Sequence, residues 1–564
     1  MHSSEEIGTL VVFMISMVFV IHRFDFPIPF SVPYLGRSIP ISLSTAPIVA
    51  ILILWASKCI VGSVIVNGIV GTGGVKPYNI LILFFSLAYM SITLDVTGIL
   101  RSAAYWVSNK GGNDGWRLFL YFYVMLTLIS IVVGNDPVIL SGTAFLVYYT
   151  QAVDELEPLP WLISEFAAAN TASMVLFLGN PTNVVICEGF GVRNVAFTAY
   201  TILPFLACSV ACFIALAVQY RSAKHLPRKI TATTLDPRSA LLDRVSAWFG
   251  SLLLGTCLVL ILVLSFFKPS IDVWMISLPF AVAKFIYDLG WDCYRFETNK
   301  PMLGRGQTDP DDIIPSENTL TPTTTGAASK LSMSQVSHQR HPTLPPTFGI
   351  TNDSLVPQPE NNGHLFPKPD SAEPTPASTS ILSHQKPLLI NRVRSRFPTF
   401  FKALPRLPFA LVPFAFSQFI LIEALAYRGW IDTFAHWLVR ATNRQIYPTI
   451  WIVGVFGVIL CNISGTNIGA TILLTKVVHA ANMPSHSLRA AAIALAVASN
   501  IGAVSFTFSA SLAGLLWKSI LTQKKIQCRQ REFAKWNILP LMAMTGVGLS
   551  VVSAEMAVLY GGVS

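Results

Sequence analysis

Short polar side chains interrupt a long apolar stretch of this chain at Gly134-Asn135-Asp136-Pro137, and again at Gly179-Asn180-Pro181. Glycine is favoured just past the end of a helix, where the backbone turns into the left-handed region. Asn or Asp suits the residue that caps the next helix, and proline suits its first turn. Each motif therefore predicts that one helix ends and another begins inside a stretch that is otherwise apolar.

A second set of interruptions lies in the C-terminal part of the chain. It comprises Asn462-Ile463-Ser464-Gly465-Thr466-Asn467, Ser499-Asn500-Ile501-Gly502 and Ser509-Ala510-Ser511. Such interruptions are costly in lipid and are tolerated where the backbone lines a cavity enclosed by protein. A single kink would be compatible with simple packing, whereas paired kinks that carry Asn and Asp favour a binding site between two repeats.

Helix ends of this kind have a definite binding chemistry. Carbonyl groups at the end of a helix attract cations, and N–H groups at its start hold anions or polar ligands. We expect no catalytic residue and no cofactor, and no metal site apart from a sodium ion near Asn135, Asp136 and Asn170. We predict that the substrate and the ion bind among Asn135, Asp136, Asn170, Thr171, Asn180, Thr182, Asn183, Ser464, Thr466, Asn467, Asn500, Ser509 and Ser511.

Asp136 is the predicted site residue that carries a formal charge. A carboxylate at the depth of a bilayer is a functional candidate by default, so Asp136 would bind sodium or carry a proton. The alternative is that it only caps a helix. Asp95 and Glu423 each occur late in an apolar stretch, one in either half of the chain. They are expected to support the site or to lie at the membrane edge, and the sequence leaves both open.

The composition is that of a membrane protein. The 564 residues are 52% hydrophobic and 12% charged, with a mean hydropathy of +0.57. A soluble protein is about 25% charged. Many stretches reach the ~18 residues that a helix needs to cross the hydrocarbon layer. We therefore predict an all-α polytopic membrane protein, embedded in a lipid bilayer.

The positions of the polar landmarks indicate an internal duplication. The separation along the chain is nearly the same from Asp95 to Glu423, from Asn135 to Asn462 and from Asn170 to Asn500. Chance does not readily produce three similar offsets. The first repeat is expected at about 78–220 and the second within 403–564.

Composition also divides the chain. Residues 1–290 are predicted to form an N-terminal membrane half, in which helices at 247–290 follow the first repeat. Residues 291–402 are rich in Pro, Ser, Thr, Asn and Gln, a composition that cannot bury enough apolar surface to fold, so a disordered linker is expected there. Residues 403–564 are predicted to form the C-terminal membrane half.

The basic residues predict the orientation. They cluster in the segment 221–246 and around the linker, which places both in the cytoplasm by the positive-inside rule. If the broken segment 118–150 enters and leaves from the cytoplasmic side, then its counterpart 449–479 enters from the outside. The two repeats are therefore predicted to have inverted topology, each with a re-entrant hairpin and a discontinuous transmembrane helix.

These residues resemble a known superfamily of ion transporters, which includes arsenite permeases, citrate-transporter-like proteins and sodium–proton antiporters. The likeness rests on Leu94-Asp95-Val96-Thr97-Gly98, Asn135-Asp136, Gly179-Asn180-Pro181-Thr182-Asn183 and the segment 509–517, which is most similar to the arsenite-permease branch. It covers roughly 45–220 and 403–560. The resemblance implies the same inverted plan, with substrate and coupling ion bound between a hairpin tip and the neighbouring break. Ala169-Asn170-Thr171 departs from the Ser-Asn-Thr of the dicarboxylate branch.

The leading functional prediction is a secondary active transporter of a small anion or a metalloid, either arsenite-like or of the citrate type, coupled to H+ or Na+. The alternatives are a sodium–proton antiporter and an anion channel. No Walker-type loop is present in the sequence, so coupling to ATP would need a separate subunit. No H-E-x-x-H or G-x-S-x-G motif is present either, which argues against an enzyme. The eight cysteines form no C-x-x-C pair, and Cys208 and Cys212 are expected to pack within a helix.

The predicted partners are a small-molecule or ion substrate and the lipid bilayer. No nucleic acid is expected, because no basic patch is interleaved with aromatic residues, and a homodimer is left open. The long linker favours the plasma or vacuolar membrane of a eukaryote. The sequence does not identify the substrate, the coupling ion, the direction of transport or the role of the linker.

Overall fold

The computed structural model describes residues 4–22, 24–32, 36–153, 156–230, 235–267, 272–298 and 392–561, and nearly all of its regular structure is helical. Within these ranges, eight segments are long and apolar enough to cross a membrane. They are α1 (Ser4–Ile21), α4 (Pro77–Val96), α6 (Gly115–Val133), α10 (Asn194–Gln219), α12 (Arg244–Phe267), the segment 398–427, α18 (Ile446–Ile463) and α22 (Gln530–Tyr560). The prediction of an all-α polytopic membrane protein is therefore confirmed.

The N-terminal region differs from the sequence prediction in one respect. Strands β1 (Phe24–Val32) and β2 (Gly36–Ile41) pair in antiparallel fashion, and no strand was expected. They are followed by two short helices, α2 (Thr45–Ala56) and α3 (Gly62–Val70). Lys58, with a φ of 58°, turns the chain between these helices.

The first repeat runs from α4 to α10. The helices beyond those already given are α5 (Ile99–Gly111), α7 (Asn135–Ala152), α8 (Pro158–Ala172) and α9 (Pro181–Phe190). The predicted interruptions are both present, because α6 gives way to α7 at Gly134 and α8 is separated from α9 by a short irregular segment. Alpha-helical structure cannot continue through the first of these points because the backbone at Gly134 has a φ of 91°.

The second repeat has the same order of helices. It comprises α16 (Leu411–Tyr427), α17 (Trp430–Thr442), α18, α19 (Asn467–Ala480), α20 (Ser485–Ile501), α21 (Leu512–Gln523) and α22, with the short 3-10 helix η2 (Phe508–Ala510) between α20 and α21. Its breaks, after Ile463 and after Ile501, are again those predicted.

Positive-φ residues give a sharper measure of the duplication than the polar landmarks do. Gly98 precedes α5 and Gly429 precedes α17, with φ values of 84° and 76°. Gly134 and Gly465, at the two hairpin tips, have φ values of 91° and 81°. The separation along the chain is identical for the two pairs. The same backbone turn therefore recurs at equivalent places in both halves.

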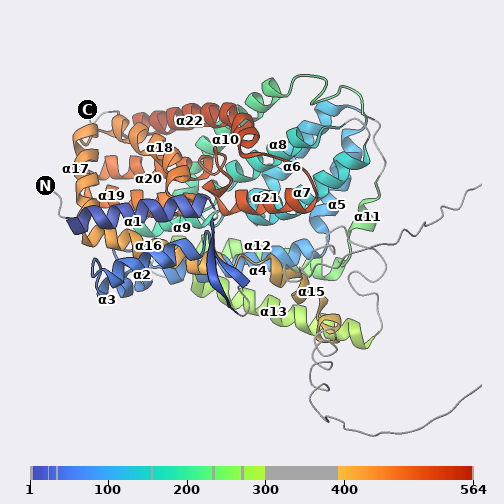
Figure 1. Cartoon of the computed structure of the whole chain (residues 1–564). Helices are drawn as coiled ribbons and strands as arrows, with labels where there is room; N and C mark the ends of the chain where they lie inside the picture. The colour runs from blue at the N-terminus through green and yellow to red at the C-terminus, as the bar shows by residue number, and fades with distance from the viewer. Residues whose placement is uncertain are drawn as a thin grey trace, which may run out of the picture. The chain divides into compact units, whose positions relative to one another are not determined.

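The two repeats are placed so that α5 and α17 lie at opposite ends of the helical body, and both chain termini lie at the α17 end (Figure 1). This is the placement that an inverted second repeat requires. The inverted topology and the sidedness of the membrane stay predictions.

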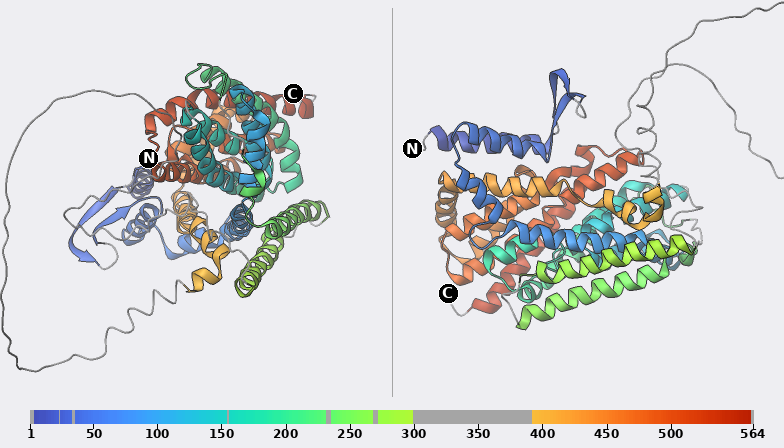
Figure 2. Two further views of the ribbon diagram at one scale, coloured as in Figure 1. Left: turned by 90° about the vertical axis from the view of Figure 1, so that its right-hand side faces the viewer. Right: turned by 90° about the horizontal axis from the view of Figure 1, so that it is seen from below.

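Two long helices, α12 and α13 (Trp274–Glu297), lie side by side at the periphery, with α13 also packed against α4 (Figure 2). A four-residue helix, α11 (Pro237–Ala240), precedes α12, and α15 (Pro398–Ala403) leads through the 3-10 turn η1 (Leu404–Arg406) to α16. Residues 299–391, most of the predicted disordered linker, lie outside the described residues. At its edges the predicted boundary differs from the structure, because α13 continues to Glu297 and α15 already begins at Pro398.

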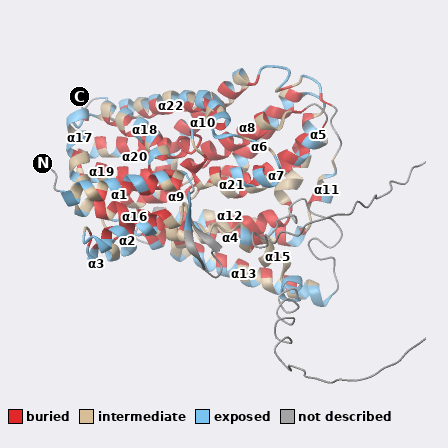
Figure 3. Ribbon diagram, viewed as in Figure 1, coloured by how far each residue is buried: buried red, intermediate tan, exposed pale blue. Residues whose placement is uncertain are grey.

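Burial separates the inner helices from the outer ones (Figure 3). In α8, every residue from Pro160 to Ala172 is buried, and in α20 every residue from Ala490 to Ile501 is buried. In contrast, α12 exposes large apolar side chains such as Trp248 and Leu252, which are 80% and 71% exposed. Exposed apolar side chains of this kind suit contact with lipid tails. Helices α8 and α20, which lead into the second break of each repeat, therefore lie innermost.

Candidate functional site at the paired helix breaks

The tip of the first hairpin is fastened to the end of α8. Asn135, the first residue of α7, donates a hydrogen bond from its side-chain Nδ2 to the Oδ1 of Asn170, at 3.1 Å. Next to it, the Ser130 hydroxyl at the end of α6 donates to the carbonyl oxygen of Ala169, at 2.9 Å. Asn135 and Asn170 are both buried. Two of the predicted site residues thus meet where the sequence analysis expected a hairpin tip to face a break.

The break between α8 and α9 exposes carbonyl groups that no helix can satisfy. Asn183 compensates for two of them, because its Nδ2 donates to the carbonyl oxygens of Ser173, at 2.8 Å, and Leu176, at 2.9 Å. Asn180 caps the new helix by accepting a hydrogen bond from the backbone N–H of Thr182, at 3.2 Å. Asn180 and Pro181 therefore begin the new helix as predicted, whereas the preceding helix already ends at Ala172 and Gly179 lies in the irregular segment between the two.

Asn500 joins the break of the second repeat to that of the first. Its Nδ2 donates to the Oδ1 of Asn183, at 2.7 Å, and its Oδ1 accepts a hydrogen bond from the Ser173 hydroxyl, at 2.8 Å. Ser499 beside it lies 3.4 Å from the Thr182 hydroxyl. These contacts bring the two halves of the chain together at the centre of the buried helices.

The second hairpin tip reaches the same cluster. Asn467, the first residue of α19, donates from its Nδ2 to the carbonyl oxygen of Ser499, at 3.3 Å. We call Asn135, Asn170, Asn183, Asn467 and Asn500 the amide cluster. All five are buried, and each comes from the start or end of an interrupted helix.

Other predicted site residues are engaged in local capping. The Thr466 hydroxyl accepts from the backbone N–H of Gly469, and the Ser511 hydroxyl accepts from that of Gly514. Ser464 donates to the carbonyl oxygen of Leu460, and Thr171 donates to that of Ala167. The buried Ser509 hydroxyl has no hydrogen-bond partner within the described residues.

The predicted acids lie in three different environments. Asp136 is half-buried in the first turn of α7, and within the described residues no hydrogen bond or ion pair is recorded for its carboxylate. Asp95 forms an ion pair with Arg406, at 3.2 Å. Glu423 forms one with Lys476, at 2.7 Å, and accepts a hydrogen bond from Thr72.

Two polar residues next to the breaks were missed as site candidates. Asn462 accepts hydrogen bonds from the backbone N–H groups of Phe506 and Thr507, at 3.2 and 3.1 Å. The second is Glu165, a fully buried carboxyl group on α8. Asn462 was recognised by its spacing as a landmark of the duplication, but its partners lie far along the chain and did not follow from the sequence. Glu165 stands alone in an apolar run, where no spacing identifies it.

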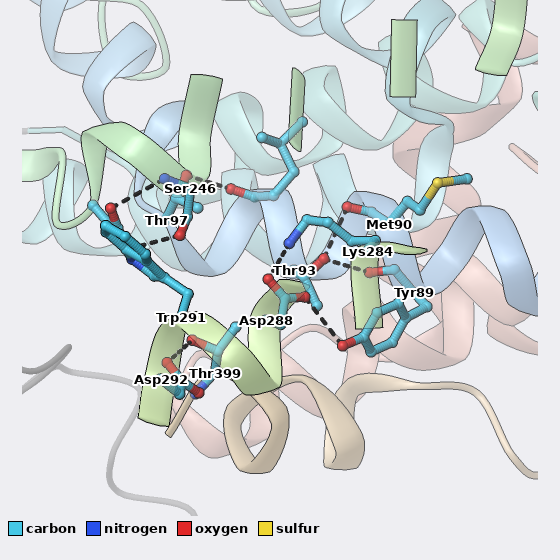
Figure 4. A network of polar contacts seen from close by, with 12 residues as sticks. Tyr89, Met90, Thr93, Thr97, Ser246, Lys284, Asp288, Trp291, Asp292 and Thr399 are labelled. Carbon is cyan, nitrogen blue, oxygen red and sulfur yellow. Dashed lines mark hydrogen bonds and ion pairs between the residues drawn. The ribbon is translucent and has the colours of Figure 1, made fainter. Parts of the chain in front are cut away.

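A separate polar network lies between α4, α13 and α15 (Figure 4). Lys284 and Asp288, four residues apart on α13, form an ion pair, and the Tyr89 hydroxyl donates to Asp288 at 3.1 Å. Asp292 accepts hydrogen bonds from the backbone N–H and the hydroxyl of Thr399, both at 2.9 Å. This network holds the start of α15 against the membrane helices.

Two cavities lie among the described membrane helices, and neither is lined by a residue of the amide cluster. One of about 20 Å³ lies beside the first tip, lined by Gly134, Gly179 and Ser91 among others. A larger one of about 250 Å³ lies between α4, α9, α12 and α13 and is lined in part by Asn79, Glu188 and Asp272. The first has room for about one water molecule. The amide cluster is therefore closed in this structure.

Metal-binding side chains are not gathered anywhere in the part of the chain that the structure describes, where no group of three or more His, Cys, Asp or Glu is found. Cys208 and Cys212 are free thiols buried on α10, in agreement with the prediction that they pack within a helix. The site thus consists of amides, hydroxyls, helix ends and isolated carboxyl groups.

The family model described as citrate transporter matches residues 7–292, just over half of the chain. The chain belongs to the citrate transporter family. Membership in this family confirms the resemblance to the ion transporter superfamily and places the chain among membrane transport proteins.

Among curated proteins, this family member is similar to bacterial arsenical pump membrane proteins. It is 24% identical to the one of Escherichia coli strain K12 over 234 residues, 38% of this chain and 53% of the relative, and likewise to that of Shigella flexneri. The chain thus spans about half the length of the curated relatives it matches. These relatives are bacterial, and none supports the expected eukaryotic plasma or vacuolar membrane.

Among solved structures, the chain is similar to the YdaH transporter of Alcanivorax borkumensis. The TM-score is 0.41 at 10% identity, with 99% of each chain covered. It is also similar to MtrF of Neisseria gonorrhoeae, with a TM-score of 0.38 at 11% identity, covering 96% of this chain and 93% of that one.

Proposed function

We propose that this protein is a secondary active transporter of a small anion or a metalloid such as arsenite, coupled to H+ or Na+. The hydrogen bond between Asn183 and Asn500 carries the proposal, because it joins the interrupted helices of both repeats. In transporters built from repeats, substrate and ion bind where such helices meet. The substrate would lie among the helix ends of the amide cluster, which suit a neutral hydroxide or an anion held by N–H groups.

The closed cluster supports alternating access. A substrate can reach Asn170 or Asn500 only if the hairpin tips separate from α8 and α20, because these residues are fully buried. The 3.1 Å contact between Asn135 and Asn170 is the one that must open at the first tip. The similarity to arsenical pump membrane proteins favours a metalloid as the first substrate to test, and the family description favours citrate as the second.

Uptake into proteoliposomes tests the proposal. Purified protein would be reconstituted and offered arsenite, citrate, phosphate, silicate or sodium, under an imposed pH gradient and separately under a sodium gradient. We expect gradient-dependent accumulation of at least one of the first four solutes. Failure of all of them to accumulate or to bind would contradict the proposal, and single-channel currents would replace it with an anion channel.

The sodium–proton antiporter remains the principal alternative, with Asp136 as the exchanging acid. Asp136→Asn separates the two functions. An antiporter would lose sodium–proton exchange in this variant, whereas an anion or metalloid carrier would retain downhill flux of its substrate. Asp432→Asn, which changes an acid on α17 outside the breaks, is the matched control.

A further inference from the structure

A carboxyl group lies fully buried between α8 and the arms of the first hairpin. Glu165 is 0% exposed, and its Oε2 accepts a hydrogen bond from the Thr143 hydroxyl of α7, at 3.0 Å. Its other oxygen, Oε1, has no hydrogen-bond partner within the described residues. No ion pair recorded for the described chain involves Glu165, so no cation compensates a charge there.

Gly142 on the α7 arm of the hairpin packs directly against the unpartnered oxygen. A methyl group built on Gly142 of α7 would lie 2.4 Å from Oε1 and 3.2 Å from a side-chain carbon of Leu126 on α6. The absence of a side chain at Gly142 therefore provides the space in which Oε1 lies. The contacts recorded for Glu165 come from uncharged groups. The nearest charged residue in sequence on α7 is Asp136, at its start, while Arg117 lies near the start of α6 and Arg489 lies near the start of α20.

This environment suits a neutral acid. An ionised carboxylate without a counter-ion is costly to bury, whereas a protonated carboxyl is not. Such a group can hold a proton while the hairpin is closed and release it when water reaches it. Glu165 also lies five residues before Asn170, about 7.5 Å along the same helix, so it shares a rigid element with the amide cluster.

We propose that Glu165 binds the coupling proton of this transporter, an inference that rests on the proposed function. When α7 moves away from α8, water on one side reaches Oε1. The proton then passes from the carboxyl group to that water, or from water to the carboxylate. In the opposite conformation, water on the other side of the membrane reaches Oε1. Thr143 donates to the carboxylate while it is charged. Substrate binding at Asn170 and protonation at Glu165 are linked because the Asn135–Asn170 contact and the Gly142–Glu165 contact belong to the same hairpin.

Glu165→Gln is the decisive variant, because it keeps the size of the side chain but cannot ionise. We expect it to abolish accumulation of arsenite or citrate driven by a pH gradient, to flatten the pH profile, and to leave downhill exchange of the same solute. Glu555→Gln is the matched control, since Glu555 is also a membrane-helix acid with a buried, unpartnered oxygen but lies on α22. It should behave as the wild type.

A measurement that needs no substrate complements the transport assay. The infrared spectrum of the full-length protein in vesicles is expected to contain the carbonyl band of a protonated carboxylic acid that is lost in Glu165→Gln and kept in Glu555→Gln. If the variant does not fold, Thr143→Val keeps the acid and removes its donor, and it should move the pH profile of transport to higher pH.

The outcomes distinguish this inference from the proposed function. Transport by the wild type with unchanged pH-driven accumulation in Glu165→Gln would overturn the role of Glu165 alone, as would coupling to sodium without any pH dependence. A wild type that moves none of the solutes would overturn the proposed function, and the infrared band would then identify Glu165 only as a buried neutral acid.

Discussion

At the scale of single residues, the amide cluster depends on contacts between helices that lie far apart in the chain, such as those from Asn500 to Asn183 and Ser173. Asn170 and Asn500 stood out because an amide inside an apolar helix is unusual and because the two recur at a similar offset. Their partners did not follow, since the contact from Asn500 to Asn183 depends on how two distant helices pack. Glu165 was missed because a lone acid in an apolar run has no spacing that identifies it.

Asn500→Ala tests the cluster at this scale. The change leaves Asn183 Oδ1 without its donor, while the Ser173 hydroxyl keeps the carbonyl oxygen of Asn170, at 2.7 Å, as an acceptor. A buried polar group left unsatisfied costs about 1–3 kcal/mol, so we expect the free energy of unfolding in detergent to fall by about that amount and substrate transport to be lost. Asn113→Ala, at an exposed position, should change neither. Full transport by the Asn500 variant would remove this residue from the site.

The buried Lys284–Asp288 ion pair allows a prediction in which a second substitution restores the stability that the first one removes. Asp288→Leu leaves the ammonium group of Lys284 buried without its carboxylate, and breaking such a pair costs about 3–5 kcal/mol. Adding Lys284→Met should restore much of that loss, apart from the Tyr89 hydroxyl that still lacks its acceptor. Thermal unfolding of both variants measures the difference. Equal stability of the single and double variants would show that the ion pair is not the dominant interaction.

At the scale of helices, the interruptions were predictable and the short connecting helices were not. Glycine, asparagine and proline specify helix boundaries through local backbone chemistry, so the break at Gly134 and the start of α9 at Pro181 agree with the sequence, whereas α8 ends at Ala172, before the Gly179 motif. Helices α5 and α17 were not predicted as separate helices from the sequence. Each follows a helix after only a short turn at a positive-φ glycine, and periodicity alone does not reveal such a change of direction.

Gly134→Ala tests whether the first tip depends on its backbone. Gly134 has a φ of 91° and a ψ of 169°, a region that is essentially restricted to glycine. A methyl group there meets only the Gly179 carbonyl oxygen, at 3.7 Å, so the cost of about 1–3 kcal/mol comes from backbone strain. We expect reduced stability and slower transport. Gly255→Ala, in the middle of α12 with open space around it, should be neutral or slightly stabilising, and equal effects of the two changes would contradict this account.

At the scale of the whole helical body, the constant spacing between matching positive-φ positions argues that one folded unit was used twice. Gly112 at the end of α5 and Asn443 at the end of α17 extend the series at the same spacing, with φ values of 61° and 48°. The offsets between polar side chains only approximated this spacing, whereas the backbone turns preserve the register. The positions that follow these turns, Asn113 and Arg444, are both exposed.

An inverted second repeat requires those two positions to face opposite compartments. Cysteines introduced as Asn113→Cys and Arg444→Cys, after replacing the partly exposed Cys59, Cys293 and Cys528 by serine, would be treated with a maleimide that does not cross membranes. In sealed vesicles of one orientation, we expect the reagent to label only one of the two variants, and the other only after permeabilisation. Helices α5 and α17 lie at opposite ends of the helical body (Figure 1). When the long helices of this body cross the bilayer, one of the two labelled positions faces each compartment. Labelling of both variants from one side would contradict the inverted plan and, with it, the expectation that the two hairpin tips approach the amide cluster from opposite faces of the membrane.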